Sequence, residues 1–164
     1  MVEIQSAQSG CIGLALLEPG DGPALRRLFY RLSPQTLYRR FHSPVVRPEQ
    51  THPERLLDVD HHDREAVVAV VNDEIVGVAR YVRTAGSDAA EIAIVVADDW
   101  QRQGLATRML SALHERALIE GIQKFTMTMQ ADNKPVQQLI RRFYPGITMT
   151  HSQGMYEATV TVAR

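Results

Sequence analysis

The sequence is poor in cysteine and carries little net charge. Cys11 is the single cysteine among 164 residues, so no disulfide can form within the chain. Its apolar neighbours predict a buried small side chain and not a nucleophile. The formal net charge of −1 gives no general reason to bind nucleic acid or an anionic membrane surface, so neither is expected as a partner.

The sequence also lacks long apolar runs. No stretch approaches the about 20 apolar residues that a membrane-spanning helix needs, and the N-terminus has no basic segment followed by an apolar core. We therefore expect neither a membrane span nor a signal peptide, and a cytoplasmic location. Hydrophobic residues make up 45% of the chain, and no repeat or linker divides it, so residues 1–164 are predicted to form a single domain.

The stretch from residue 91 to residue 118 carries the strongest pattern. The mostly β-branched run 92–96 predicts a strand buried on both faces, because an exposed strand would alternate polar with apolar residues. A loop with small residues at Gly104 and Ala106 follows, where the next helix must begin. Small residues let a ligand approach the backbone, and the first N–H groups of a helix are unpaired and partly positive. The stretch therefore predicts a phosphate-binding site.

This loop differs from the two commoner phosphate-binding loops. It lacks the second and third glycines of the dinucleotide fingerprint, and no Gly-Lys-Ser or Gly-Lys-Thr follows. Instead, Gln101-x-x-Gly104-x-Ala106 resembles the Gln/Arg-x-x-Gly-x-Gly/Ala signature of the Gcn5-related N-acetyltransferase (GNAT) superfamily. The resemblance implies an acyltransferase that binds the pyrophosphate of acetyl-coenzyme A (acetyl-CoA), its cosubstrate, at this loop and uses no metal.

Hydrophobic periodicity predicts the order of the structural elements. Strands are expected at 11–17, 66–71, 75–82, 92–96, 124–129, 147–150 and 155–162, and helices at 25–32, 33–41, 105–121 and 132–143. Arg39 and Arg40 are expected on the polar face of the second helix. The order β, α, α, β, β, β, α, β, α, β, β matches the GNAT fold. That fold is of the α/β (α+β) class, with a mixed, mostly antiparallel central sheet of about six to seven strands flanked by helices.

Further blocks of sequence narrow the resemblance. Residues 32–41, 60–65, 75–81 and 90–92 are similar to the acetyltransferase domain of the Pat-type protein lysine acetyltransferases. In that subfamily the glutamate that opens the central strand is taken as the general base, and Glu91 matches it. The resemblance implies transfer of an acetyl group from acetyl-CoA to an amine by direct attack, with a protein lysine side chain as the expected acceptor.

The resemblance also assigns the coenzyme contacts. The backbone of the central strand would pair with the pantetheine arm, the loop N–H groups would bind the pyrophosphate, and an asparagine before the last helix would contact the arm. These residues are Ile94, Val95 and Val96 on the strand, Arg102, Gln103, Gly104, Leu105, Ala106 and Thr107 in the loop, and Asn133. Many family members carry a tyrosine seven residues beyond that asparagine as the acid for the departing thiolate. This chain has Ile140 there, and Tyr144 lies out of register.

Glu91 has two interpretations. Its apolar neighbours Ala90 and Ile92 predict desolvation at the mouth of a buried strand, which suits a base that acts near neutral pH. Alternatively, Glu91 is a strand-end carboxylate paired with Arg80 or Arg83. The presence of the glutamate favours an enzyme. The missing tyrosine motivates the alternative, a non-catalytic acetyl-CoA-binding sensor module.

The resemblance implies that the connection between the first two strands, which includes the segment 56–63, is a lid over the acceptor side. Its carboxylates, Asp58, Asp60 and Asp63, would attract a cationic lysine, unless they only solubilise a loop. Adjacent residues rarely bind one metal together, so His61 and His62 predict a solvated loop and not a metal site. A small-molecule amine or a protein N-terminus is the main alternative acceptor. The sequence leaves open whether the protein is a monomer or a homodimer.

Overall fold

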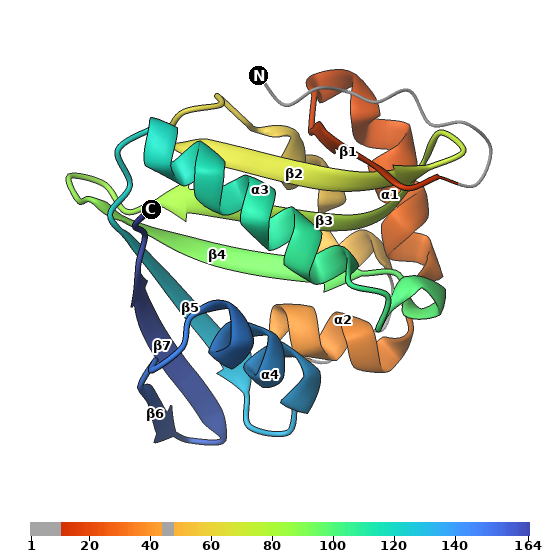
Figure 1. Ribbon diagram of the computed structural model, residues 1–164. Helices are drawn as coiled ribbons and strands as arrows, with labels where there is room; N and C mark the ends of the chain where they lie inside the picture. Colours follow the sequence, from red (N-terminus) through yellow and green to blue (C-terminus); the bar gives the residue numbers. More distant parts are fainter. Residues whose placement is uncertain (1–10, 44–47) are drawn as a thin grey trace.

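The computed structural model describes residues 11–43 and 48–164, which fold around one open sheet (Figure 1). Its strands are β1 (Gly13–Leu16), β2 (Arg64–Val71), β3 (Glu74–Arg83), β4 (Ala89–Val96), β5 (Lys124–Gln130), β6 (Met149–Ser152) and β7 (Met155–Thr161). The α-helices are α1 (Gly22–Arg31), α2 (Pro34–Phe41), α3 (Leu105–Ile119) and α4 (Lys134–Phe143). Short 3-10 helices lie in the connections: η1 (Pro19–Asp21), η2 (Pro48–Thr51), η3 (Pro53–Leu57) and η4 (Asp98–Trp100). The predicted order of strands and α-helices is confirmed.

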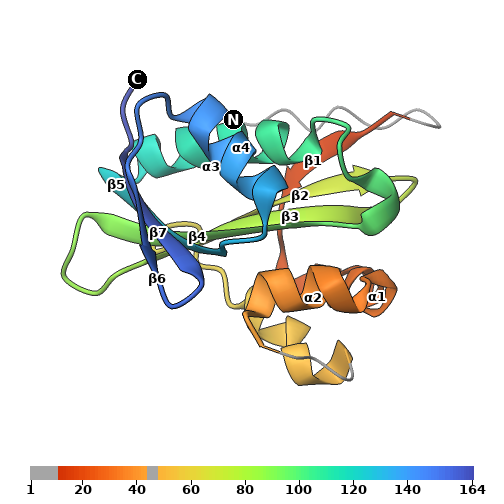
Figure 2. The ribbon, with the colours of Figure 1, turned by 90° about the horizontal axis from the view of Figure 1, so that it is seen from below.

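The described strands form a seven-stranded sheet in the order β1-β2-β3-β4-β5-β7-β6. β4 and β5 pair in parallel, whereas the other neighbours pair antiparallel, which confirms the mixed, mostly antiparallel sheet. Helices α3 and α4 cover one face of the sheet, and α1, α2 and the short helices between α2 and β2 lie on the other (Figure 2). We call these two surfaces of the sheet the α3 face and the α2 face.

The central strands form where apolar residues run without interruption. Residues 65–69 of β2 and 75–79 of β3 are buried, as expected for strands that are covered on both faces. Asn72 and Asp73 connect the two strands with φ angles of 48° and 63°. Two consecutive residues at positive φ make a tight turn whose twist matches that of a hairpin, so the predicted hairpin is confirmed.

A polar cluster fixes the start of α2 against the loop that follows β4. The Ser33 hydroxyl accepts a hydrogen bond from the Thr36 backbone N–H at 3.2 Å, as an N-cap residue does. Asp98 in turn accepts from the Ser33 N–H at 2.8 Å and from the hydroxyls of Ser33 and Thr36 at 2.7 Å. Burial opposes the charge on Asp98, but these hydrogen bonds lower its pKa. The cluster therefore ties α2 to the loop that precedes α3.

The N-terminal strand is shorter than predicted, and Cys11 is not buried. The pairing of β1 with β2 begins at Gly13, so Cys11 lies before the strand. Its side chain is consequently exposed, and the prediction of a buried cysteine is wrong. In the part of the chain that the structure describes, no helix is long and apolar enough to span a bilayer.

Candidate active site

Strands β4 and β5 stay paired over a short distance. Residues 89–91 lie opposite residues 124–126, and the described ladder between the two strands ends there. Beyond Glu91, β4 remains paired with β3, while β5 continues against β7. The two strands therefore separate after Glu91 (Figure 1), and residues 92–96 have no strand partner on that edge in the described structure. We call this opening the gap.

Two hydrogen bonds show which backbone groups of β4 face the gap. The Ala97 N–H donates to a carbonyl of β3 at 2.8 Å, which directs it toward β3. The Val96 carbonyl accepts from Nε2 of Gln101 at 3.0 Å and so points away from β3. Backbone direction alternates along a strand, so the N–H and C=O groups of Ile94 and Val96 face the gap, while those of Val95 face β3. Of the three predicted strand contacts, Ile94 and Val96 thus offer backbone groups to a ligand.

The loop before α3 presents unpaired backbone N–H groups. Gly104 is the N-cap residue of α3, and its φ of 79° is a left-handed conformation that favours glycine. A Cβ added there would meet no heavy atom within 4 Å, so the space in front of the backbone is open. The first helical hydrogen bond runs from the Arg108 N–H to the Gly104 carbonyl at 3.2 Å, which leaves the N–H groups at 105–107 without helical acceptors. Together with the exposed Arg102 and Gln103, this geometry fits a pyrophosphate.

Asn133 holds the N-cap position of α4, but its side chain does not cap the helix. Within residues 11–43 and 48–164 its half-buried amide forms no hydrogen bond, so it is available to a ligand. Ile140, where many family members have a tyrosine, is buried in the core. The Tyr144 hydroxyl lies 2.9 Å from Nδ1 of His114 in α3, and burial raises the pKa of Tyr144. The Tyr144 hydroxyl is therefore held by a contact between α3 and the end of α4. This agrees with the prediction that Tyr144 lies out of register for the role of the acid.

Glu91 projects from the α2 face of the sheet at the start of the gap. Gly77 of β3 lies against α3, because an added Cβ would be 2.9 Å from Cε of Met109. Side chains alternate along a strand and paired residues share a face, so Tyr81 and its partner Ile92 also lie on the α3 face. Glu91, one residue earlier, therefore lies on the α2 face, where it is exposed. The prediction that its apolar neighbours desolvate Glu91 is therefore wrong for the protein without a bound substrate or coenzyme.

Two arginines flank Glu91 on the same face. Arg80 pairs with Ala93 in the β3–β4 register, which places it diagonally across from Glu91. Arg40 comes from α2, with its guanidinium carbon 4.8 Å from the centre of the Phe41 ring, and its charge interacts with both Arg80 and Glu91. Burial, followed by the Arg80 charge, lowers the pKa of Arg40 to about 10, and Glu91 opposes this shift. Arg40 is half-buried, so the predicted polar face of α2 is only partly open to solvent at this residue.

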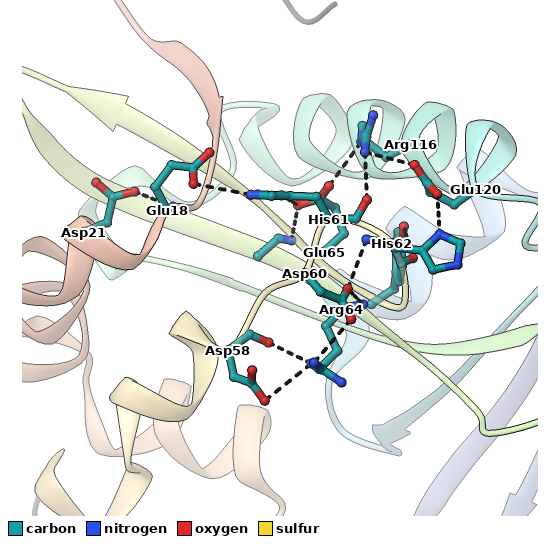
Figure 3. Close-up of polar contacts among 12 residues, drawn as sticks. Glu18, Asp21, Asp58, Asp60, His61, His62, Arg64, Glu65, Arg116 and Glu120 are labelled. Atoms are coloured by element: carbon teal, nitrogen blue, oxygen red, sulfur yellow. Dashed lines mark hydrogen bonds and ion pairs between the residues drawn. The ribbon is translucent and has the colours of Figure 1, made fainter.

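The segment 58–65 is held by charged partners from several elements (Figure 3). The fully buried carboxylate of Glu65 lies 2.8 Å from Nδ1 of His61 and accepts a hydrogen bond from Nε of Arg116 in α3 at 3.1 Å. On the other side of its ring, Nε2 of His61 lies 3.3 Å from Glu18. The prediction of a solvated loop is therefore wrong for His61. Over the described ranges, no group of three or more His, Cys, Asp or Glu side chains could hold a metal ion.

The three aspartates of this segment have arginine partners. Asp58 and Asp60 lie 3.4 and 3.2 Å from Arg64, and Asp63 lies 2.7 Å from Nε of Arg83. Because Asp58 and Asp60 share Arg64, the three carboxylates face two arginines, and most of their negative charge is balanced within the protein. Arg83 is also occupied by Asp63, so of the two partners that the alternative interpretation named for Glu91, only Arg80 lies near it.

The contact between His61 and Glu65 predicts a pH-dependent contribution to stability. The hydrogen bond to Glu65, opposed by burial and assisted by Glu18, raises the pKa of His61 above its ordinary value. A histidine whose pKa rises on folding stabilises the fold fully below its unfolded pKa of about 6.5, and this contribution is lost as pH rises through the folded value. The destabilisation caused by His61→Gln, measured by urea unfolding, is therefore expected to be larger near about pH 6 than near about pH 9.

His151 provides the control for this measurement. It is exposed and stacks on Tyr156, and no carboxylate contacts it in the described chain. His151→Gln should therefore cost the same at both pH values. Equal destabilisation by His61→Gln at low and high pH would contradict the assignment.

The fold agrees with a comparison to known families. The model of the acetyltransferase (GNAT) family matches residues 29–144. The chain therefore belongs to the GNAT family of acetyltransferases, enzymes that use acetyl-CoA. The GNAT domain of S. lividans PAT has the same fold, with a TM-score of 0.84 at 23% identity over 93% of this chain and 91% of that domain. The GNAT fold predicted from the sequence is confirmed.

Proteins of similar sequence support the resemblance to the Pat-type acetyltransferases. The chain is 32% identical over 127 residues to acetyltransferase Pat of Mycolicibacterium smegmatis, which covers 76% of this chain and 38% of that protein. It is 28% identical over 127 residues to an acetyltransferase of Pseudomonas aeruginosa, which covers 75% of this chain and 68% of that protein. The chain therefore corresponds to well under half the length of the mycobacterial relative.

Proposed function

We propose that this protein transfers an acetyl group from acetyl-CoA to a lysine side chain of another protein, with Glu91 as the general base. The observation that carries the proposal is the position of Glu91, exposed on the α2 face at the residue where β4 and β5 separate. An acceptor amine can reach this carboxylate from solvent, while the edge of β4 that faces the gap can bind the thioester of acetyl-CoA beside it. The whole chain, residues 1–164, would act as one acetyltransferase domain.

The predicted parts of the coenzyme site have matching features, except for Val95, whose backbone faces β3. The N–H groups at 105–107 and the exposed backbone at 102–104 suit the negatively charged pyrophosphate. Backbone groups of Ile94 and Val96 suit the amides of the pantetheine arm, which would pair with β4 as a neighbouring strand does. The side-chain amide of Asn133 suits a further polar group of that arm. Acetyl-CoA itself supplies the activated acetyl thioester.

The reaction requires little from side chains beyond a base. A lysine ammonium, with a reference pKa of about 10.4, must lose its proton before its nitrogen can attack a carbonyl. Glu91 would take that proton, directly or through a water molecule. The N–H groups of Ile94 and Val96 would donate to the oxyanion as the tetrahedral centre forms. The leaving thiol has a reference pKa of about 8.5, so it can depart without a dedicated acid, which is consistent with the buried Ile140.

A protein lysine is the acceptor that the observations favour. The Pat-type sequence blocks and the likeness to a protein named acetyltransferase Pat both support it. The exposure of Glu91 supports it as well, since a lysine is held in place by its own protein, whereas a small amine is best bound in an enclosing pocket. The sensor module is less favoured, because binding alone does not require a carboxylate at the start of the gap.

Acetylation assays distinguish these acceptors. With acetyl-CoA in excess, kcat/KM is expected to be higher for lysine side chains in folded proteins and N-terminally blocked peptides than for polyamines or aminoglycosides. Peptides whose single amine is the N-terminus test the third acceptor class, and mass spectrometry locates the acetyl group. Faster acetylation of the small amines or N-termini would reject the lysine assignment. Acetyl-CoA binding without turnover of any amine would favour the sensor module.

A further inference from the structure

The α2 face beside Glu91 carries more positive than negative charge. Arg40 and Arg80 share this region with Glu91, and His42 at the end of α2 interacts with both Arg40 and Glu91. Arg40 stacks on Phe41. Within the described residues, neither arginine forms a hydrogen bond or an ion pair. Glu91 interacts with both guanidinium groups, whereas Asp58 and Arg64 act on Arg80 with opposite charges.

Other arginines that contact the sheet are paired differently. Each has a carboxylate oxygen within 4 Å, namely Glu74 for Arg27, Asp60 for Arg64, Asp63 for Arg83 and Glu65 for Arg116. Arg40 and Arg80 depart from this pattern although both are half-buried. In the described structure, Arg40 and Arg80 thus lack the direct carboxylate contact that these other arginines have, including Arg27 and Arg31, which share Glu74.

Partial burial makes the lack of a partner costly. Burial is the first cause that lowers the pKa of both Arg40 and Arg80, so water compensates their charges incompletely. A guanidinium can bind a carboxylate through two parallel N–H···O bonds, an arrangement stronger than a neutral hydrogen bond. A substrate carboxylate near these two side chains would supply the missing contact.

We propose that Arg40 and Arg80 determine acceptor specificity by binding the carboxylate of an Asp or Glu residue adjacent to the acceptor lysine. This inference rests on the proposed function, because the acceptor must approach Glu91 from the α2 face in order to give up its proton. Both arginines lie on that face, Arg80 on the strand next to β4 and Arg40 on the helix that packs against β4. The same charges would repel a lysine whose neighbours are basic, which adds discrimination by exclusion.

Matched peptides test the inference. Two N-terminally blocked peptides with one lysine differ at the adjacent residue, which is Glu in one and its neutral isostere Gln in the other. The wild-type protein is expected to favour the Glu peptide by roughly 10-fold or more in kcat/KM, the size of effect that a hydrogen bond between charged groups produces. Most of the difference should lie in KM for the peptide. In Arg40→Gln and Arg80→Gln the ratio between the two peptides should fall toward 1.

Two further variants make the result specific. Arg141→Gln removes the same charge from an exposed position of α4 and should keep the wild-type ratio. Arg80→Lys keeps the charge without the planar guanidinium, so it should retain part of the preference, and it replaces Arg80→Gln if that variant does not fold. Thermal unfolding of each variant confirms that it is folded.

The outcomes separate this inference from the proposed function. A wild-type ratio near 1 between the peptides, with lysine acetylation intact, overturns the inference and leaves the proposed function standing. The inference is also overturned if Arg141→Gln loses the preference for the Glu peptide to the same extent as Arg40→Gln and Arg80→Gln. If Arg40→Gln and Arg80→Gln alter the choice between acetyl-CoA and succinyl-CoA, but not between the peptides, the arginines serve the acyl chain and the inference is wrong. If the protein acetylates no lysine at all, both the inference and the proposed function are wrong.

Discussion

Replacing Glu91 with glutamine is expected to lower kcat for lysine acetylation by about 100-fold or more, the factor typical of losing a general base. Glutamine keeps the shape of the side chain but cannot take the proton of the acceptor. Because Glu91 is exposed, the protein should still fold and keep nearly its full affinity for acetyl-CoA, although removing this charge beside Arg40 and Arg80 should lower the unfolding temperature. Steady-state kinetics with a lysine peptide and calorimetry with acetyl-CoA measure the two quantities.

Glu115 offers a matched control for this substitution. It is an exposed glutamate of α3, and Glu115→Gln makes the same chemical change away from the gap. Its kcat should equal that of the wild-type protein. An undiminished kcat in Glu91→Gln would instead move the role of the base to another group or to water. A matching fall in both variants would point to a general effect of charge.

Gly104→Val is expected to weaken acetyl-CoA binding at least roughly 100-fold, or about 2.7 kcal/mol, in calorimetry. The φ of 79° at Gly104 strains any branched residue, so the backbone donors that follow would shift. The added side chain would also project into open space in front of the loop, where a Cβ meets no protein atom within 4 Å. A pyrophosphate bound to those N–H groups needs that space.

Gly146 separates the loss of the binding site from backbone strain. Its φ is also 79°, and a Cβ there also meets nothing within 4 Å, but it follows α4 instead of preceding α3. Gly146→Val should lower the unfolding temperature to a similar extent and leave acetyl-CoA affinity unchanged. Wild-type affinity in a folded Gly104→Val protein would mean that the pyrophosphate binds elsewhere.

The strand, loop and helix that we propose to bind the coenzyme could be predicted because they are neighbours in sequence. A strand, a loop with Gly104 and the following helix lie within one short stretch, so their spacing survives folding whatever the rest of the chain does. The order of the elements follows from hydrophobic periodicity for the same local reason. The prediction places Glu91 at the head of its strand, whereas β4 begins at Ala89, and the exposure of Glu91 depends on what packs around it.

The group of residues that we propose on the acceptor side could be predicted only in part, as a pairing of Glu91 with Arg80, because the residues come from separate elements. Arg40, Arg80 and Glu91 meet after α2 has packed against β4 and the β3–β4 register is set. One signal was present in the sequence: Arg80 is a charged residue within an otherwise apolar strand. The burial of Glu65 gave no such signal, since its partner Arg116 lies 51 residues away.

Three residue pairs join β4 to β5 in the described sheet. They connect a part made of β1, β2, β3 and β4 to a part made of β5, β7 and β6 along a short contact, which we call the hinge. On the proposed function, a pantetheine arm paired with β4 would lie beside this hinge and complete the missing ladder. The coenzyme would then be a structural component as well as a reactant. At 100 times its dissociation constant, such a ligand stabilises the folded state by about 2.7 kcal/mol. An acetyltransferase of this kind would be most stable when acetyl-CoA is bound and the reaction can begin.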